Sequence, residues 1–198
     1  MSFTARVIWI ACAVASAIAV GAYATEHFTR TFPGFAPLKT GPWTAYPGVA
    51  TSAADPYARA YLSRTGRLSI ADTEGIDFSA SDDSDGRPLS PNCNYALFGE
   101  IPANRLWTFR VSPNADIRTN APTQGTVTTS RSHVRVEGSD IHLHVGKKPT
   151  GLNWHQISGD ESERLRFTFA LYDSPVATAT GFSELEMPSI KRMECVDG

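Results

Sequence analysis

The longest hydrophobic stretch of the chain lies at its N-terminus. Residues 7–24 contain no charged side chain, and Arg6 and Glu26 flank them. About 18 residues at about 1.5 Å each give roughly 27 Å of helix, close to the hydrocarbon thickness of a bilayer. Trp9 and Tyr23 lie near its two ends, where aromatic side chains often meet the membrane interface. The pattern predicts a single N-terminal transmembrane helix.

Two fates are open for residues 1–24. The run Ala22-Tyr23-Ala24 is also typical of a signal-peptide cleavage site, so the segment is either a retained anchor or a cleaved signal peptide. The positive charge of Arg6 favours a cytoplasmic N-terminus. We expect a single-pass protein of the bacterial inner membrane with its domain in the periplasm. Cleavage would instead give a soluble periplasmic protein.

Residues 25–50 are rich in proline, glycine and aromatic side chains and show neither a helical nor a strand period. This composition predicts a connector that becomes ordered when Trp43 and Tyr46 pack onto a following domain. The domain itself is expected over residues 51–198.

One short helix and then a series of strands follow the connector. Asp55 suits the N-cap of the helix, Pro56 its first position and Gly66 its end. From Glu74 onward, apolar and polar residues alternate, as in half-buried strands. The predicted strands are residues 76–80, 94–100, 106–111 and 165–171.

Residues 133–145 predict a hairpin. A two-residue turn at Gly138-Ser139 would pair Val134 with Leu143 and make one face of the hairpin apolar. Many short strands separated by turns predict a mainly β fold. We expect an antiparallel β-sandwich resembling a jelly roll, with one short helix, preceded by the N-terminal transmembrane helix.

Composition narrows the choice of partners. The 198 residues carry 18 basic and 20 acidic side chains, a net charge of −2. Such a balance provides no broad cationic surface for a phosphate backbone, so nucleic acid is not an expected partner. The inner membrane is expected as a partner through the N-terminal helix.

The three cysteines predict one disulfide. Cys12 lies inside the hydrophobic segment and is interpreted as a small apolar residue. Cys93 and Cys195 remain, and an even pair in an exported domain is most simply explained by a disulfide. We expect this bond to hold a C-terminal tail that has little else to fix it.

The histidines of the predicted hairpin are the candidates for a metal site. His133, His142 and His144 would share its polar face, although Arg135 beside them would repel a cation. A solvated sheet face is the favoured interpretation, and we expect no metal or other cofactor. The chain also has no nucleophile elbow, phosphate loop, dinucleotide fingerprint or Cys-x-x-Cys pair, so whether it is an enzyme stays uncertain, with a non-enzymatic role favoured.

Several short motifs, in order and spacing, resemble one known family, the domain of unknown function 1214 (DUF1214), in its short membrane-anchored proteobacterial form. The resemblance runs from about Gly41 to the C-terminus. Two positions depart from the family pattern: His155-Gln156 replaces the usual Leu-Pro, and Leu152 stands where a glycine is expected. The motifs are Gly41-Pro-Trp43, Asp55-Pro-Tyr57, Asp85-Gly86, Cys93-Asn-Tyr95, Trp107-Thr108, Asn153-Trp154 and Leu171-Tyr172-Asp173.

The resemblance implies a jelly-roll-like sandwich, a companion DUF1254-type protein, fused or separate, and no established catalysis. Within it, Trp107, Asn153 and Trp154 line either a ligand groove or the buried edges of the sheets. The favoured function is a non-enzymatic binding or assembly module that pairs with a DUF1254-type protein. The alternative is a hydrolase or other enzyme that acts on envelope glycans or lipids.

Overall fold

The computed structural model describes residues 2–31, 34, 37–65, 69–71, 73–114, 126–135, 140–157, 164–175 and 185–195. Two helices and ten strands lie in these ranges, and most of the domain is β structure. The helices are α1 (Phe3–Thr31) and α2 (Pro56–Thr65). The strands are β1 (Leu38–Thr40), β2 (Trp43–Ala45), β3 (Gly75–Ala80), β4 (Cys93–Gly99), β5 (Leu106–Pro113), β6 (Val127–Thr129), β7 (Ile141–Gly146), β8 (Trp154–Gln156), β9 (Leu165–Tyr172) and β10 (Ser189–Cys195).

The strands form two sheets that face each other as in a sandwich. The large sheet has the order β1-β2-β3-β9-β5-β6, and the small sheet has the order β10-β4-β7-β8. All pairs are antiparallel except β7 with β8, which is parallel. The mainly β, two-sheet fold is therefore confirmed, whereas the jelly-roll topology stays a prediction.

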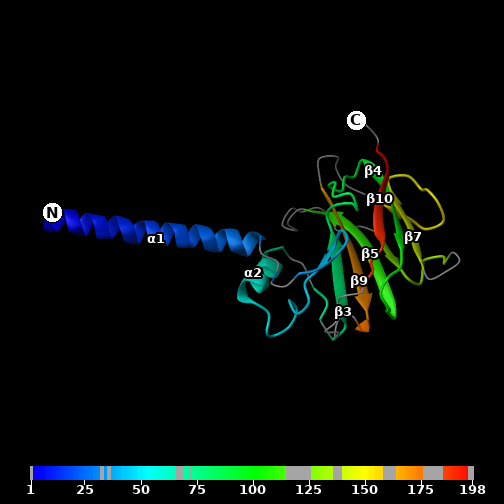
Figure 1. Ribbon diagram of the computed structural model, residues 1–198, viewed down its shortest axis with the longest axis horizontal. Coiled ribbons are helices and arrows are strands. Elements are labelled where there is room, and N and C mark those ends of the chain that lie inside the picture. The colour runs from blue at the N-terminus through cyan, green and yellow to red at the C-terminus, as the bar shows by residue number, and fades with distance from the viewer. Residues whose placement is uncertain are drawn as a thin grey trace.

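The helix α1 extends away from the β domain (Figure 1). It is 29 residues long, its most apolar part has a mean hydropathy of 2.1, and none of that part is buried in the protein. By length and composition it can cross a membrane, as a single-pass anchor or a signal peptide.

The helix α2 begins as the sequence predicts. The carboxylate of Asp55 accepts hydrogen bonds from the backbone N–H groups of Tyr57 (2.8 Å) and Ala58 (3.2 Å), which is the N-cap geometry. Its predicted end at Gly66 lies outside the described residues. α2 contacts the C-terminal end of α1, so it lies between the apolar helix and the sandwich (Figure 1).

Aromatic rings fill the core between the sheets on the side of the large sheet. The ring of Phe169 lies 5.1 Å from Trp107, 5.6 Å from Phe109 and 5.9 Å from Trp43, measured between centroids. All four side chains are buried. The small sheet contributes mostly aliphatic side chains to the same core: Leu97, Ile141, Leu143, Val145, Ile157 and Ile190.

Two strands, β1 and β2, lie in the region that the sequence predicts to be a connector without strands. Each has only three residues, too few to show an alternating pattern. Trp43 in β2 is fully buried, and its indole N–H donates a hydrogen bond to the carbonyl of Pro188 (2.6 Å). The expected packing of Trp43 is confirmed, but it is part of the sheet itself.

The hairpin predicted over residues 133–145 is not formed as expected. Both neighbours of β7 are other strands, β4 and β8, and residues 133–135 are not in a strand. The predicted turn at Gly138-Ser139 lies outside the described residues. The second half of the prediction was right, because Ile141, Leu143 and Val145 all point into the core.

The C-terminal tail is also better held than expected. Residues of β10 pair with β4 from Ser189 opposite Phe98 to Arg192 opposite Tyr95, so backbone hydrogen bonds fix this strand in addition to any covalent link. The sequence suggested an unsupported tail because polar residues outnumber apolar ones in this edge strand, of which Ile190 is the buried member.

Candidate functional site

Asn153 organises the edge of the small sheet. Its side chain is buried; the oxygen accepts a hydrogen bond from the Val134 N–H (2.8 Å), and the amide group donates to the carbonyls of Val134 (2.8 Å) and His142 (3.0 Å). One side chain thus replaces the backbone pairing that a hairpin would have supplied. The segment around Val134 is held beside β7 by Asn153 rather than by a strand ladder.

The other two predicted groove residues lie on different sides of this edge. Trp107 is buried, and its ring packs at 5.4 Å against the imidazole of His133. Trp154 is half-buried on β8, and its indole N–H donates to the carbonyl of Gly146 (3.2 Å). Trp107 and Asn153 therefore meet the same segment, His133-Val134, whereas Trp154 faces away from it.

The three candidate metal-binding histidines are neighbours without forming a ligand cluster in the described residues. The Nε2 atom of His133 lies 3.2 Å from the carbonyl of His142, and burial lowers the pKa of His133 below its usual value. His142 and His144 project from the outer face of β7. The turn at Gly151, with φ of +85°, approaches His144 so closely that a Cβ there would lie 2.7 Å from its ring.

His155 is a buried titratable residue that the sequence analysis did not propose as a site residue. Its side chain is fully buried between the sheets, its Nδ1 lies 2.8 Å from the hydroxyl of Thr128, and its ring packs against Phe109. The Nε2 atom has no hydrogen-bond partner among the described residues. Burial lowers the pKa of His155 to about 4. The signal was present, since His155 lies two residues before the apolar Ile157, and residues two apart in an extended segment share one face.

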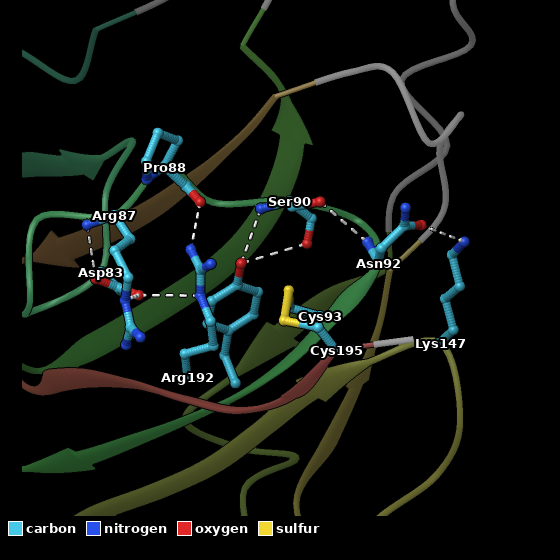
Figure 2. Close-up of a disulfide and its surroundings, with 10 residues drawn as sticks. Asp83, Arg87, Pro88, Ser90, Asn92, Cys93, Lys147, Arg192 and Cys195 are labelled. Atoms are coloured by element: carbon cyan, nitrogen blue, oxygen red, sulfur yellow. Dashed lines mark hydrogen bonds and ion pairs between the residues drawn. A yellow bond between two sulfur atoms is a disulfide. The ribbon is translucent and has the colours of Figure 1, made fainter. Parts of the chain in front are cut away.

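The disulfide between Cys93 and Cys195 is confirmed and joins directly opposed residues of β4 and β10. Figure 2 shows it beside a buried carboxylate, that of Asp83. This carboxylate lies 3.1 Å from the guanidinium groups of both Arg87 and Arg192.

Asp83 also organises its own loop. Its carboxylate accepts hydrogen bonds from the backbone N–H groups of Asp85 (3.1 Å) and Arg87 (2.9 Å). Burial by itself would raise the pKa of Asp83, but these hydrogen bonds and the charges of Arg192 and Arg87 outweigh it and lower the pKa. The acidic loop is therefore a turn tied to β10 through Arg192.

The exposed side of the small sheet carries apolar and imidazole groups. Phe98 lies opposite His142, and Ala96 lies opposite His144. Phe98 is 41% exposed, and Leu152 in the turn before β8 is 77% exposed. We call this surface the small-sheet outer face and define it by Ala96, Phe98, His142, His144, Leu152 and Trp154.

A cavity of about 550 Å³ lies at one end of the large sheet, where β3, β5, β6 and β9 begin or end. Arg105 and Asp173 form an exposed ion pair at its rim, 3.5 Å between their charged atoms. Asp173 has a positive φ of 51°, which turns the chain sharply at the end of β9. The remaining lining residues are Thr73, Glu74, Leu106, Ser130, Arg131 and Tyr172.

The sequence model of the family "Protein of unknown function (DUF1214)" matches residues 74–176. The chain belongs to the DUF1214 family. The match is shorter at both ends than the predicted resemblance, so Gly41-Pro-Trp43 and Asp55-Pro-Tyr57 lie outside it. It includes Trp107, Asn153 and Trp154, as well as all of the cavity residues except Thr73.

One solved structure supports the fold, and a second aligns more weakly. The VPA0106 protein from Vibrio parahaemolyticus aligns with a TM-score of 0.52 and 17% identity, over 72% of this chain and 36% of that chain. A protein from Burkholderia cenocepacia aligns with a TM-score of 0.45 and 7% identity, over 87% of this chain and 40% of that chain. The DUF1214 chain thus spans less than half the length of either one. No curated protein matches the sequence.

Proposed function

We propose that this DUF1214 protein is a non-enzymatic binding module whose N-terminal helix is retained as a single-pass anchor in the bacterial inner membrane, with the β domain in the periplasm. The β domain binds a protein partner through the small-sheet outer face. The observation that carries the proposal is the exposure of adjacent apolar and imidazole side chains on this face. A solvated sheet face normally carries polar residues.

The register of the strands places these side chains next to one another, so they form one continuous surface. Phe98 and His142 are directly paired across β4 and β7, and His144 lies beside both Ala96 and Trp154. Aromatic and imidazole groups next to an exposed leucine are the composition expected at the centre of a protein interface.

The proposed occupant is a DUF1254-type protein. The family resemblance implies such a companion, either fused or separate. Most of the Vibrio parahaemolyticus chain lies outside its alignment with this protein. A module that is joined to further chain in a structural neighbour is expected to present a surface for a companion.

The test is a binding measurement between the full chain in nanodiscs and a purified DUF1254-type protein from the same organism. The double substitution Phe98→Ser with Leu152→Ser should weaken binding at least about tenfold, a change of about 1.4 kcal/mol. Val127→Ser is the matched control, because Val127 is 52% exposed on the other sheet. Binding that is absent, or equally strong in the double variant, would contradict the proposal.

One observation favours the second candidate, a hydrolase or other enzyme acting on envelope glycans or lipids. The cavity of about 550 Å³ has Glu74 in its lining together with the ion pair of Arg105 and Asp173. If the cavity is catalytic, the protein should hydrolyse peptidoglycan fragments or phospholipid vesicles, and Glu74→Gln should abolish that activity. Products that form equally fast with Glu74→Gln would exclude this cavity as the source.

A further inference from the structure

The position of α2 is fixed by the last turns of α1. Glu26 is the first charged residue after the apolar run of residues 7–24. Its carboxylate forms an ion pair with Arg64 of α2 (2.8 Å). Two residues further along α1, the ring of Phe28 lies 6.3 Å from the ring of Tyr57. One polar and one aromatic contact therefore join α2 to α1 just beyond its apolar part.

These contacts define how far α2 lies from the lipid. At about 1.5 Å per residue, Glu26 lies about 3 Å and Phe28 about 6 Å along the helix from residue 24. The headgroup layer on each side of the hydrocarbon is about 5–7 Å thick. If residues 7–24 span the hydrocarbon, Tyr57 and Arg64 are at headgroup depth.

The faces of α2 are divided between the domain and solvent. Ala58 is buried, and Tyr61 and Leu62 line a cavity of only about 20 Å³ against β2 and β3. Arg59 is exposed, and Tyr57 is 45% exposed although it contacts α1. Tyr57 and Arg59 are two residues apart, so they lie on opposite flanks of the buried Ala58 and present a phenol and a guanidinium group outside the packed side of α2.

Phenol and guanidinium groups are the side chains expected at a lipid headgroup layer. Tyrosine combines an apolar ring with a polar tip and is enriched at membrane interfaces. The planar guanidinium group of arginine donates paired hydrogen bonds to phosphate. The two groups therefore suit the depth at which α1 holds them.

We propose that α2 is a second membrane contact of this protein, in which Tyr57 and Arg59 lie in the headgroup layer and bind lipid phosphate. The contact fixes the orientation of the β domain on the membrane, because a single helix would otherwise leave the domain free to rotate about its connector. The inference rests on the retained anchor of the proposed function.

The experiment uses the full chain in nanodiscs of phosphatidylcholine and phosphatidylglycerol that contain a nickel-chelating lipid. Cys12→Ser removes the free thiol, and a spin label is attached either at Ser63→Cys, an exposed position on α2 that leaves Tyr57 and Arg59 in place, or at Gln156→Cys, an exposed control position on β8. We expect headgroup nickel to relax the label at residue 63 several-fold more strongly than the label at residue 156. Equal relaxation of the two labels would overturn the proposal.

A second variant tests whether α1 sets the depth. With Glu26→Ala and Phe28→Ala combined, both described contacts between α1 and α2 are lost while Tyr57 and Arg59 are kept, and the relaxation of a label at residue 63 should fall toward that at residue 156. Arg110→Ala, which removes an exposed arginine of β5, should leave it unchanged. Relaxation that stays strong in the double variant would contradict the α1-dependent placement.

The outcome can be separated from that of the partner proposal. Intact mass shows whether residues 1–24 are present, and a chain cleaved after residue 24 would overturn both the anchor and the membrane contact of α2. Binding to the DUF1254-type protein uses the small-sheet outer face, so its loss or retention leaves the spin-label result unaffected.

Discussion

The two sheets of the sandwich are stabilised in different ways. The inner side of the large sheet is rich in aromatic rings, with Phe169 in contact with Trp43, Trp107 and Phe109. The small sheet places shorter side chains in the core and adds polar and covalent links at its borders. These links are the amide of Asn153, the ion pairs of Asp83, and the disulfide at Cys195.

The outer faces of the two sheets also differ, but here the larger side chain belongs to the small sheet. On the large sheet, small side chains such as Thr168 and Ala170 are turned outward and nevertheless remain nearly inaccessible, and α2 covers the area near Ser79. On the small sheet, the larger side chain of Phe98 is exposed. The sheet with the larger rings inside thus exposes the smaller valine of β6, Val127, whereas the other sheet exposes an aromatic ring.

This difference indicates separate roles for the two sheets in stabilising the domain and in presenting a surface. A sheet whose edge strands are tied by specific bonds depends less on burying every apolar side chain, so it can present some of them to a partner. Among the described residues, the large sheet carries side-chain hydrogen bonds and an exposed ion pair but neither a disulfide nor a buried carboxylate in an ion pair, so more of its stability must come from packing. The comparison therefore makes distinct predictions for substitutions in each sheet.

The largest effect is expected in the core of the large sheet. Phe169→Ala removes a fully buried ring that contacts three other rings, and it should lower the free energy of unfolding by about 4–5 kcal/mol. Leu143→Ala is the matched truncation in the small sheet and should cost less, about 3 kcal/mol. Urea unfolding of both variants measures the difference. A larger loss of stability for Leu143→Ala than for Phe169→Ala would contradict the stronger packing inside the large sheet.

The disulfide is the next strongest link and belongs to the small sheet alone. Cys93 and Cys195 are 102 residues apart, and removing such a cross-link by Cys195→Ser should lower stability by about 2–5 kcal/mol. Because β10 also pairs with β4, we expect only the last residues of β10 to fray, as hydrogen exchange would show. The double variant Cys93→Ser with Cys195→Ser should behave like the single one. A stability within about 0.5 kcal/mol of the unmodified protein would show that the ladder alone holds this edge.

Much of this asymmetry was visible in the sequence, but only where the pattern was local. Alternation predicted β3, β4, β5 and β9 because each is long enough to show a period of two. The even pair of cysteines predicted the disulfide because two cysteines in a domain that is expected to be exported most simply form one. The strands β1, β2 and β8 have three residues each and are defined by their neighbours, so no local signal identified them.

The candidate site was less predictable for the same reason. Asn153 and Trp107 were singled out by motif, but the segment that they share, His133-Val134, is brought to them by the tertiary fold. The pairing of Asp83 with Arg192 joins residues that are far apart in the chain. Such contacts depend on which strands are neighbours, and the sequence does not contain that information in any single window.

The smallest of the predicted effects on stability concerns His155, the buried polar residue of the small sheet. Its pKa is about 4 in the folded protein, below the usual value near 6.5, so the unfolded chain binds more protons between these two pH values. Stability from this group is therefore complete above pH about 6.5 and is lost as the pH falls toward 4. At pH 5 the loss should be about 2 kcal/mol relative to pH 7.5.

The substitution that tests this effect is His155→Leu, which puts an apolar side chain of similar size in the core and removes the titrating group. Combining it with Thr128→Val avoids leaving the Thr128 hydroxyl without its partner. The free energy of unfolding in urea, measured between pH 5 and 7.5, should depend less on pH in the double variant. A small slope will persist, because burial also lowers the pKa of His133. If the double variant and the unmodified protein lose stability equally over this range, His155 is not the titrating group, and the small sheet tolerates a charged imidazole in its core.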